Sequence, residues 1–316
     1  MPRRFILLPV ALLAFMALAQ SAAAAKKEAT IAVLAFRGMA ETLKRWSPTA
    51  NYLTQNVPGH KFRIVPLSLD QIGDAARRDE VDFVLTNSGN YVDLEARYGI
   101  SRIATLRSPD RVTAGNVFGA VIFVRADRRD IRNLSDLAGK SLMAVKSKGF
   151  GGFQMAWREI REAGIDPFED LSSLQFSGFP QDAVAYGVRD GKVDVGTFRS
   201  GSLESLAAEG KIARSDFRIL NAKTYPGFPY PVSTRLYPEW PFSRLRSTAQ
   251  QLSQDVAVTL LQMPAGSPAA VQGSYGGWTV PLDYQRVHEL FRLLRIGPYE
   301  HLGDITLTDL FDQHGP

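Results

Sequence analysis

Four short polar segments of this chain carry side chains that can bind an anion, and each follows a run of apolar residues. Arg37 follows the first such run, and Arg199 lies in the segment 197–200. Segment 86–91 reads Thr-Asn-Ser-Gly-Asn-Tyr, and segment 147–152 reads Ser-Lys-Gly-Phe-Gly-Gly. Guanidinium, ammonium, hydroxyl and amide groups are the donors that oxyanions need, and none of the four segments contains a carboxylate. We therefore expect a site for a tetrahedral or sulfonate-like anion.

The glycine-rich segment 147–152 is the strongest of the four candidates. Its three glycines let backbone N–H groups converge on an oxyanion, and Lys148 adds positive charge. The segment is not a dinucleotide-binding motif, because Gln154 stands where the last glycine would be. It is not a P-loop either, because no Lys-Ser/Thr pair follows the glycines. The alternative interpretation is a flexible turn.

The other segments also have interpretations that need no ligand. Ser88 or Asn90 would cap a helix that begins near them, and Arg37 and Arg199 would be solvated surface charges. The candidate ligand contacts are Arg37, Thr86, Asn87, Ser88, Tyr91, Lys148, Gly151, Thr197 and Arg199. Candidate walls of the site are the rings of Tyr91, Phe150, Phe153 and Phe198, which would otherwise belong to the core.

Signatures of an enzyme are missing from the sequence. His60, His288, His301 and His314 are not spaced as metal ligands, no Gly-x-Ser-x-Gly motif occurs, and the chain has no cysteine. A cationic site is also the wrong environment for a carboxylic acid of raised pKa. We therefore expect a binding protein without a metal or cofactor.

The elements that must position these segments alternate between strand and helix patterns. Strands are predicted over 31–36, 62–67, 82–86, 102–106, 119–125, 141–146, 174–179, 193–198 and 217–220. Helices are predicted over 40–55, 70–78, 90–98, 153–163, 249–262 and 287–294, with one more near Leu203. The order predicts an α/β fold with mainly parallel sheets. In such sheets ligands collect at the carboxyl ends of strands, which is where the four polar segments stand.

A faint internal repeat suggests two similar units. Segment 77–85 reads Arg-x-x-x-Val-Asp-Phe-Val-Leu, and segment 189–197 reads Arg-x-x-x-Val-Asp-Val-Gly-Thr. Each is interpreted as a helix end, a turn and a buried strand. Coincidence is the alternative, since any array of strands and helices can produce such an echo.

The first 25 residues have the three parts of a secretory signal peptide. Two arginines precede an apolar run over 5–19, and small residues lead to a cleavage site near Ala25. The alternative, a membrane anchor, needs a run of about 20 apolar residues. We expect an exported periplasmic chain that is not inserted in the membrane, and the absence of cysteine excludes disulfides and lipid attachment through a thiol.

The charge balance narrows the class of partner. The chain has 37 basic and 32 acidic residues, and the basic residues form no stripe of the kind that binds nucleic acid. The small positive excess is better interpreted as local attraction for a small anion.

From about 31 to 299 the chain resembles periplasmic solute-binding proteins of the phosphate, phosphite and phosphonate uptake type. A narrower resemblance is to the sensor domain of tetrathionate-sensing histidine kinases. The residues that carry it are Val-Leu-Ala-Phe-Arg-Gly at 33–38, Val-Asp-Phe-Val-Leu-Thr-Asn at 81–87, Phe-Gly-Gly-Phe-Gln-Met-Ala-Trp at 150–157, Ser-Thr-Arg-Leu-Tyr-Pro-Glu-Trp-Pro at 233–241 and Gly-Trp-Thr-Val-Pro at 277–281.

The resemblance implies a two-lobed type 2 periplasmic-binding fold that closes over a ligand by hinge bending. It places lobe 1 at 26–123 and 225–316 and lobe 2 at 124–224. In phosphonate binders a hydroxyl-rich loop at the start of a lobe 2 helix holds the oxyanion. The counterpart here, 147–152, is glycine-rich instead, so a larger or sulfur-containing oxyanion becomes comparable with phosphonate as the expected ligand.

The resemblance also implies the partners. The leading hypothesis is a monomeric carrier that hands a small oxyanion to an ABC importer. The second is a sensory subunit that presents a sulfur oxyanion such as tetrathionate to a separate histidine kinase, since the sequence given ends without kinase modules. The third is an enzyme that acts on a sulfur or phosphorus oxyanion.

Overall fold

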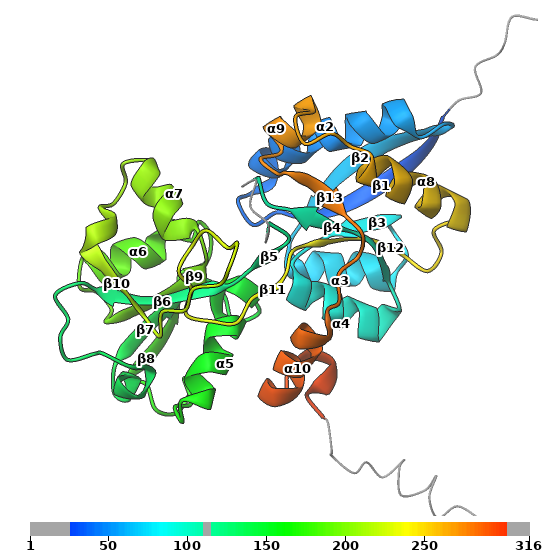
Figure 1. The fold of residues 1–316 in the computed structure, drawn as a ribbon. Helices are drawn as coiled ribbons and strands as arrows, with labels where there is room; N and C mark the ends of the chain where they lie inside the picture. The colour runs from blue at the N-terminus through cyan, green and yellow to red at the C-terminus, as the bar shows by residue number, and fades with distance from the viewer. Residues whose placement is uncertain (1–25, 110–114, 302–316) are drawn as a thin grey trace, which may run out of the picture.

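Two β-sheets, each with helices on both faces, form the two lobes of the molecule (Figure 1). The computed structural model describes residues 26–109 and 115–301. The predicted signal peptide, 1–25, lies outside the described residues. We call the lobe with the six-stranded sheet lobe 1 and the lobe with the five-stranded sheet lobe 2.

Lobe 1 is built from both ends of the described chain, and its sheet has the strand order β13, β4, β12, β3, β1, β2. The strands are β1 (Lys27–Leu34), β2 (His60–Leu67), β3 (Phe83–Leu85), β4 (Ser101–Arg107), β12 (Pro241–Arg244) and β13 (Gly277–Thr279). One face packs against α2 (Met39–Asn56), α8 (Gln250–Leu261) and α9 (Pro268–Gln272). The other packs against α3 (Leu69–Arg77), α4 (Ser88–Tyr98) and α10 (Gln285–Leu294). Strands β1, β2 and β3 are parallel, and β12 runs against β3.

Lobe 2 repeats this arrangement around the strand order β10, β6, β9, β7, β8. The strands are β6 (Ala120–Arg125), β7 (Ser141–Ala144), β8 (Ser173–Phe176), β9 (Val195–Arg199) and β10 (Phe217–Leu220). Helices α6 (Asp182–Arg189) and α7 (Ser202–Ala208) cover one face. The 3₁₀ turn η1 (Leu134–Leu137) and helix α5 (Met155–Glu162) cover the other. Here too the central strands are parallel, and β6 runs against β9.

The chain passes between the lobes through two short strands that pair with each other. Strand β5 (Val117–Phe118) leads into β6 of lobe 2, and β11 (Tyr237–Pro238) leads into β12 of lobe 1. The two strands are antiparallel and form a sheet of their own. We call this pair the hinge strands, and Figure 1 shows them between the lobes.

The internal repeat has the same structural role in both lobes. Asp82 accepts hydrogen bonds from the amide of Thr30 (2.7 Å) and from its hydroxyl (3.0 Å), which ties the turn before β3 to β1. Asp194 accepts the equivalent pair from Ser141, both at 2.8 Å, which ties the turn before β9 to β7. In each lobe the preceding helix ends at the arginine of the echo, Arg77 or Arg189. The predicted helix end, turn and buried strand are therefore confirmed in both units.

The structure differs from the predicted elements mainly at strand ends and in the proline-rich region. The strand predicted over 193–198 is β9, Val195–Arg199, and it extends to Arg199 because this segment pairs with β6 along its whole length. The helix predicted from 153 begins earlier, as the π-helix η2 (Phe150–Gln154). Three strands beyond residue 225, β11, β12 and β13, were not predicted. Pro241 is the first residue of β12, a position where a strand tolerates a residue without an N–H. In the described ranges no helix has both the length and the apolar composition that crossing a membrane requires.

Asp194 gives a test of the repeat. Replacing it by alanine removes the acceptor of two hydrogen bonds and the partner of Arg128. We expect Asp194→Ala to lower the free energy of unfolding by about 1–3 kcal/mol in urea denaturation, since a half-buried amide and hydroxyl lose their acceptor. The matched control, Asp190→Ala, changes an exposed carboxylate that pairs with the neighbouring Arg189, and should leave the midpoint almost unchanged.

The effect of Asp194→Ala also has an expected pH dependence. Burial acts to raise the pKa of Asp194, but hydrogen bonds from Ser141 and the pair with Arg128 outweigh it and lower the pKa overall. A carboxyl with a lowered pKa stabilises the fold at neutral pH and loses that contribution as the pH falls through its folded-state pKa. The stability difference between wild type and variant should therefore shrink in acid, and a difference that grows would contradict this account.

Candidate functional site

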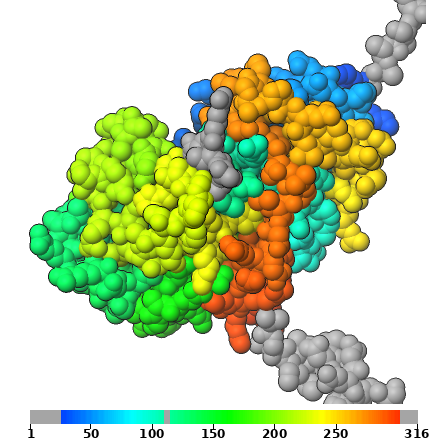
Figure 2. All heavy atoms as spheres, in the orientation of Figure 1, coloured from blue at the N-terminus to red at the C-terminus, as the bar shows by residue number. Residues whose placement is uncertain are grey.

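A cleft between the lobes is lined by several cationic and hydroxyl side chains. It consists of an outer cavity of about 400 Å³ and an inner cavity of about 170 Å³. The two cavities share six lining residues and are therefore neighbours in the cleft; these are Phe36, Arg45, Phe118, Gln181, Arg199 and Glu239. We call these six residues the neck. Figure 2 shows lobe 2, mainly green, in contact with the blue, cyan and orange parts of lobe 1.

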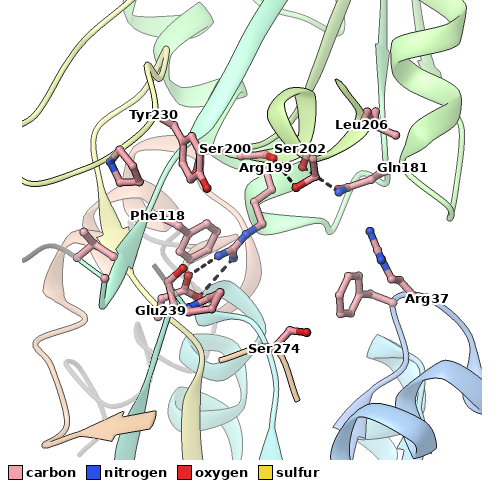
Figure 3. A pocket seen from close by; sticks show the side chains of 18 of the residues that line it. Arg37, Phe118, Gln181, Arg199, Ser200, Ser202, Leu206, Tyr230, Glu239 and Ser274 are labelled. Atoms are coloured by element: carbon pink, nitrogen blue, oxygen red, sulfur yellow. Dashed lines mark hydrogen bonds and ion pairs between the residues drawn. The ribbon is translucent and has the colours of Figure 1, made fainter. Parts of the chain in front are cut away.

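Arg199 and Glu239 form an ion pair at the centre of the neck. Arg199 ends β9 in lobe 2, and Glu239 directly follows the hinge strand β11. Both terminal nitrogens of the guanidinium contact the carboxylate, which is only 2% exposed. The guanidinium also lies over the ring of Phe118 in β5, 4.2 Å from its centroid. Arg199 is thus fixed by groups next to or within both hinge strands (Figure 3).

Two more arginines reach the cleft from lobe 1. Arg37 lies in the turn after β1. The next residue, Gly38, has a φ of +91° and is the N-cap of helix α2. Arg45 is the seventh residue of that helix and donates to the carbonyl of Gly273 at 2.7 Å. Burial lowers the pKa of Arg45 to about 10, and repulsion from Arg199 and Arg37 acts in the same direction, while Glu239 opposes it. The three guanidinium groups therefore repel one another across the cleft, and a bound anion would relieve that repulsion.

The inner cavity lies where two helices begin, one from each lobe. Gly151 and Gly152 line it from the first turn of η2, which continues into α5, and Asn87 lines it as the N-cap of α4. Amides in a first helical turn have no acceptor within the helix and carry partial positive charge. The Asn87 oxygen accepts from the amide of Asn90 at 2.9 Å, which leaves its NH₂ group as a donor. The inner cavity thus offers hydrogen-bond donors, with apolar walls such as Trp240.

Close packing brings the two helix starts together. A side chain on Gly89, in the first turn of α4, would place its Cβ 2.8 Å from the ring of Phe150 in lobe 2. Phe150 packs against both hinge strands through Phe118 and Tyr237. It also meets Phe291 of α10. The lobes therefore share a small hydrophobic core behind the inner cavity.

Four of the predicted contacts line the cleft. Arg37 lines the outer cavity, Asn87 and Gly151 line the inner cavity, and Arg199 lines both. They come from both lobes, and the fold brings them to one space as the strand-end argument expected. Contact of each with a ligand stays a prediction.

The other five predicted contacts line neither of these two cavities, because their side chains have partners elsewhere or lie inside a sheet. Thr86 donates to Asn90 at 2.9 Å, and Ser88 donates to the carbonyl of Pro238 in a hinge strand. Tyr91 contacts Glu95 and Arg102 on the far side of α4. The remaining two are Lys148, which is exposed and pairs with Asp70 across the lobes at 2.9 Å, and Thr197, which is buried within β9.

Of the four rings predicted as walls of the site, Phe150 lines the inner cavity. Phe198 packs on Phe123 inside lobe 2, and Phe153 stacks on Trp157 under α5. These two rings, together with Tyr91, belong to the core, as the alternative interpretation held.

Sequence reasoning missed Arg45, Phe118 and Glu239, which are central to the cleft. Arg45 has the helical surroundings of an ordinary surface residue, and Glu239 stands in the proline-rich region where no strand was predicted. One available signal was the acidic residue between Pro238 and Trp240 in a stretch otherwise poor in charge. Among the described residues, no group of three or more histidine, aspartate or glutamate side chains is arranged to hold a metal.

Glu239→Gln tests the central ion pair. The amide keeps the shape of the carboxylate but loses the charge that neutralises the half-buried Arg199. We expect the free energy of unfolding to fall by about 1–3 kcal/mol in urea. Glu209→Gln is the matched control, because Glu209 is exposed and pairs with the exposed Lys211. Equal effects of the two substitutions would mean that the Arg199–Glu239 pair does not stabilise the neck.

Comparisons with known proteins agree with this geometry. The family model described as "ABC transporter, phosphonate, periplasmic substrate-binding protein" matches residues 31–284. The tetrathionate sensor histidine kinase TtrS of Salmonella typhimurium is 34% identical over 271 residues, which are 85% of this chain and 44% of that protein. The chain thus spans less than half the length of this curated relative.

Solved structures show the same fold at low identity. PhnD1 from Prochlorococcus marinus in complex with methylphosphonate has a TM-score of 0.67 at 14% identity, covering 85% of this chain and 98% of that one. XAC2383 from Xanthomonas citri has a TM-score of 0.66 at 21% identity, covering 83% and 95%. The aliphatic sulphonate-binding protein SsuA from Escherichia coli has a TM-score of 0.52 at 15% identity, covering 86% and 89%. The predicted two-lobed type 2 periplasmic-binding fold is confirmed.

Family membership settles the class of the protein and its compartment. The prediction of an exported, periplasmic solute-binding protein is confirmed in that coarser form, and the matching family is one of binding proteins. By its family match and its cleft, the chain belongs to the periplasmic substrate-binding proteins of phosphonate ABC transporters.

Proposed function

We propose that this protein binds a small oxyanion in the cleft between its lobes and delivers it to an ABC importer. The observation that carries the proposal is the meeting of three arginines from both lobes, Arg37, Arg45 and Arg199, in one cleft. Only Glu239 pairs with any of them among the described residues. Asp182 and Glu209, which also line the outer cavity, pair with Lys211. An anion is the ligand that three neighbouring guanidinium groups favour.

Hinge bending at the strands β5 and β11 is the proposed motion. Each lobe supplies one helix start to the inner cavity, so an anion there would contact both lobes at once and favour the closed arrangement. The pair between Lys148 and Asp70 crosses the lobes at the exposed surface and would break when they separate.

The proposed ligand class includes phosphonate-like and sulfur oxyanions. The glycines of η2 offer backbone amides where the family's phosphonate binders use hydroxyls, and backbone amides do not discriminate between phosphorus and sulfur centres. Phe36, Phe118 and Trp240 give the cleft an apolar surface that suits an alkyl or sulfur-containing part of the ligand.

A sensory role is the second candidate, and the 34% identity to a tetrathionate sensor kinase favours it. In that role the liganded form would bind a separate histidine kinase instead of a permease. Uptake of labelled ligand by cells that lack the protein distinguishes the two roles: reduced uptake supports transport, whereas unchanged uptake with lost induction of a response regulator supports sensing.

The proposal includes the mature form of the chain. Cleavage near Ala25 would release a monomer whose lobe 1 comprises residues up to about 123 and again from about 225, with lobe 2 between them. The first proposed change of lobe falls within β6, shortly after the hinge strand β5, and the second comes before the hinge strand β11, which begins at Tyr237.

The anion proposal is tested by thermal shift and calorimetry with a panel of ligands. The panel contains methylphosphonate, phosphite, ethanesulfonate, thiosulfate and tetrathionate, and at least one should raise the melting temperature at millimolar concentration. Arg45→Gln should weaken binding of that ligand by about 10- to 100-fold, which is the worth of a charged hydrogen bond. Arg63→Gln, which changes an exposed arginine paired with Glu28, is the matched control.

The outcome that contradicts the proposal is also defined. No stabilisation by any member of the panel, in protein shown to be folded by circular dichroism, would refute oxyanion binding. Recovery of the ligand intact after denaturation separates binding from the third hypothesis, because an enzyme would release product instead.

A further inference from the structure

The segment that carries Glu239 is held in place from lobe 1. This segment, 238–240, leads from the end of the hinge strand β11 to the start of β12. The hydroxyl of Ser88, in the first turn of α4, donates to the carbonyl of Pro238. The hydroxyl of Tyr284, the N-cap residue of α10, donates to the carbonyl of Glu239 at 2.5 Å. Two helix starts of lobe 1 therefore each fix one carbonyl of this segment.

The other backbone groups of the segment have partners as well. The amide of Glu239 donates to the carbonyl of Asn116 at 2.9 Å, and the amide of Trp240 donates to the Glu239 carboxylate at 3.3 Å. The carbonyl of Trp240 accepts from the amide of Leu106 at 2.9 Å. A buried polar segment whose groups all have partners is held in one conformation, so the backbone of Glu239 has little freedom to turn.

The Tyr284 hydroxyl is itself oriented by a short chain of hydrogen bonds. The amide of Leu282 donates to the Thr105 hydroxyl at 3.1 Å, and the hydroxyl oxygens of Thr105 and Tyr284 lie 3.2 Å apart. Because Tyr284 gives its hydrogen to Glu239, Thr105 is the donor between these two hydroxyls. The hydrogen bonds thus run in one direction, from Leu282 through Thr105 and Tyr284 to Glu239. Thr105 is 0% and Tyr284 1% exposed, so water does not compete for these bonds.

The ring of Tyr284 is fixed by contacts that do not involve its hydroxyl. It packs against the ring of Tyr91, with the centroids 5.1 Å apart, and the Arg102 guanidinium lies 5.3 Å from its centroid. Burial raises the pKa of Tyr284 above its ordinary value, although the hydrogen bond with Thr105 acts in the opposite direction. The side chain therefore stays protonated and remains a donor at neutral pH. Replacing it by phenylalanine removes this donor and keeps the ring contacts.

We propose that Tyr284 is a positioning residue of the anion site, although it lines neither the inner nor the outer cavity. Its hydroxyl fixes the backbone of Glu239, the Glu239 carboxylate fixes the guanidinium of Arg199, and Arg199 lines both cavities. A guanidinium that is already held in place loses less conformational entropy when a ligand binds. The proposal rests on the proposed function, because it concerns ligand affinity in the same cleft.

The test is a double-mutant cycle on ligand affinity. Calorimetry with the five panel anions, methylphosphonate, phosphite, ethanesulfonate, thiosulfate and tetrathionate, gives dissociation constants for wild type, Tyr284→Phe, Glu239→Gln and the double variant. We expect Tyr284→Phe to weaken binding by about three- to tenfold, which is the cost of ordering one released side chain. In the Glu239→Gln background the ion pair is already lost, so the same substitution should change the dissociation constant by less than about twofold.

Two further variants separate positioning from a general loss of stability. Tyr275→Phe removes another buried tyrosine hydroxyl of lobe 1, which bonds to Thr49 at 2.9 Å on the opposite face of the sheet. It should lower the urea midpoint and leave ligand affinity unchanged. Thr105→Val keeps Tyr284 and removes the hydroxyl that orients it, so it should weaken binding in the wild-type background and not in the Glu239→Gln background. Circular dichroism establishes that each variant is folded.

The possible results separate this proposal from the proposed function. If a panel anion binds but Tyr284→Phe changes its dissociation constant no more than Tyr275→Phe does, the positioning role is overturned while oxyanion binding stands. An equal effect of Tyr284→Phe in the wild-type and Glu239→Gln backgrounds overturns it too, because the hydroxyl would then act independently of the ion pair. If no panel anion binds the folded wild-type protein, both proposals fail.

Discussion

The ion pair between Arg199 and Glu239 fixes the centre of the cleft. A carboxylate that is 2% exposed is costly to bury without a cation, so Glu239 holds the guanidinium in one place. Phe118 covers the guanidinium from the other hinge strand. The end of β9 in lobe 2 is therefore tied to the crossing between the lobes, and both cavities are arranged around this contact.

The remaining charges of the cleft depend on that pair. Arg199 is paired with Glu239, so Arg45 and Arg37 are the arginines of the cleft without a carboxylate partner among the described residues. The lowered pKa of Arg45 reflects burial together with repulsion from Arg199 and Arg37. The helix starts of α4 and η2 add donors that need no rearrangement to meet a ligand. This preorganised site is divided between two lobes, so ligand binding and hinge closure are expected to be coupled.

The scaffold that holds these groups is the same in both lobes. Asp82 and Asp194 each tie a central parallel strand to the turn before its neighbour, which sets the register of the strands that lead to the cleft. After each crossing between the lobes, the chain adds one antiparallel strand to the sheet that it enters. Strand β6 joins the sheet of lobe 2, and β12 joins the sheet of lobe 1. Each hinge strand is short and only connects one sheet to the other.

Much of this protein was determined by local sequence pattern. Short β-rich runs that alternate with segments of helical period predicted the α/β fold, and polar strand ends predicted that Arg37, Asn87, Gly151 and Arg199 belong to one site region. The family match to a periplasmic binding protein agrees with the resemblance carried by short motifs along the whole chain. These features are readable because each depends on residues only a few positions apart.

Only the tertiary structure decided which side chains meet. Tyr91 and Thr197 stand in the right segments, yet Tyr91 faces Arg102 and Thr197 lies within the sheet, because the direction of a side chain depends on helix and strand ends that shift by one or two residues. Arg45 and Glu239 carry no local signal, since their partners lie far away in the chain. A charge separated by almost 200 residues from its neighbour in space becomes part of a site only when the hinge and both sheets have formed.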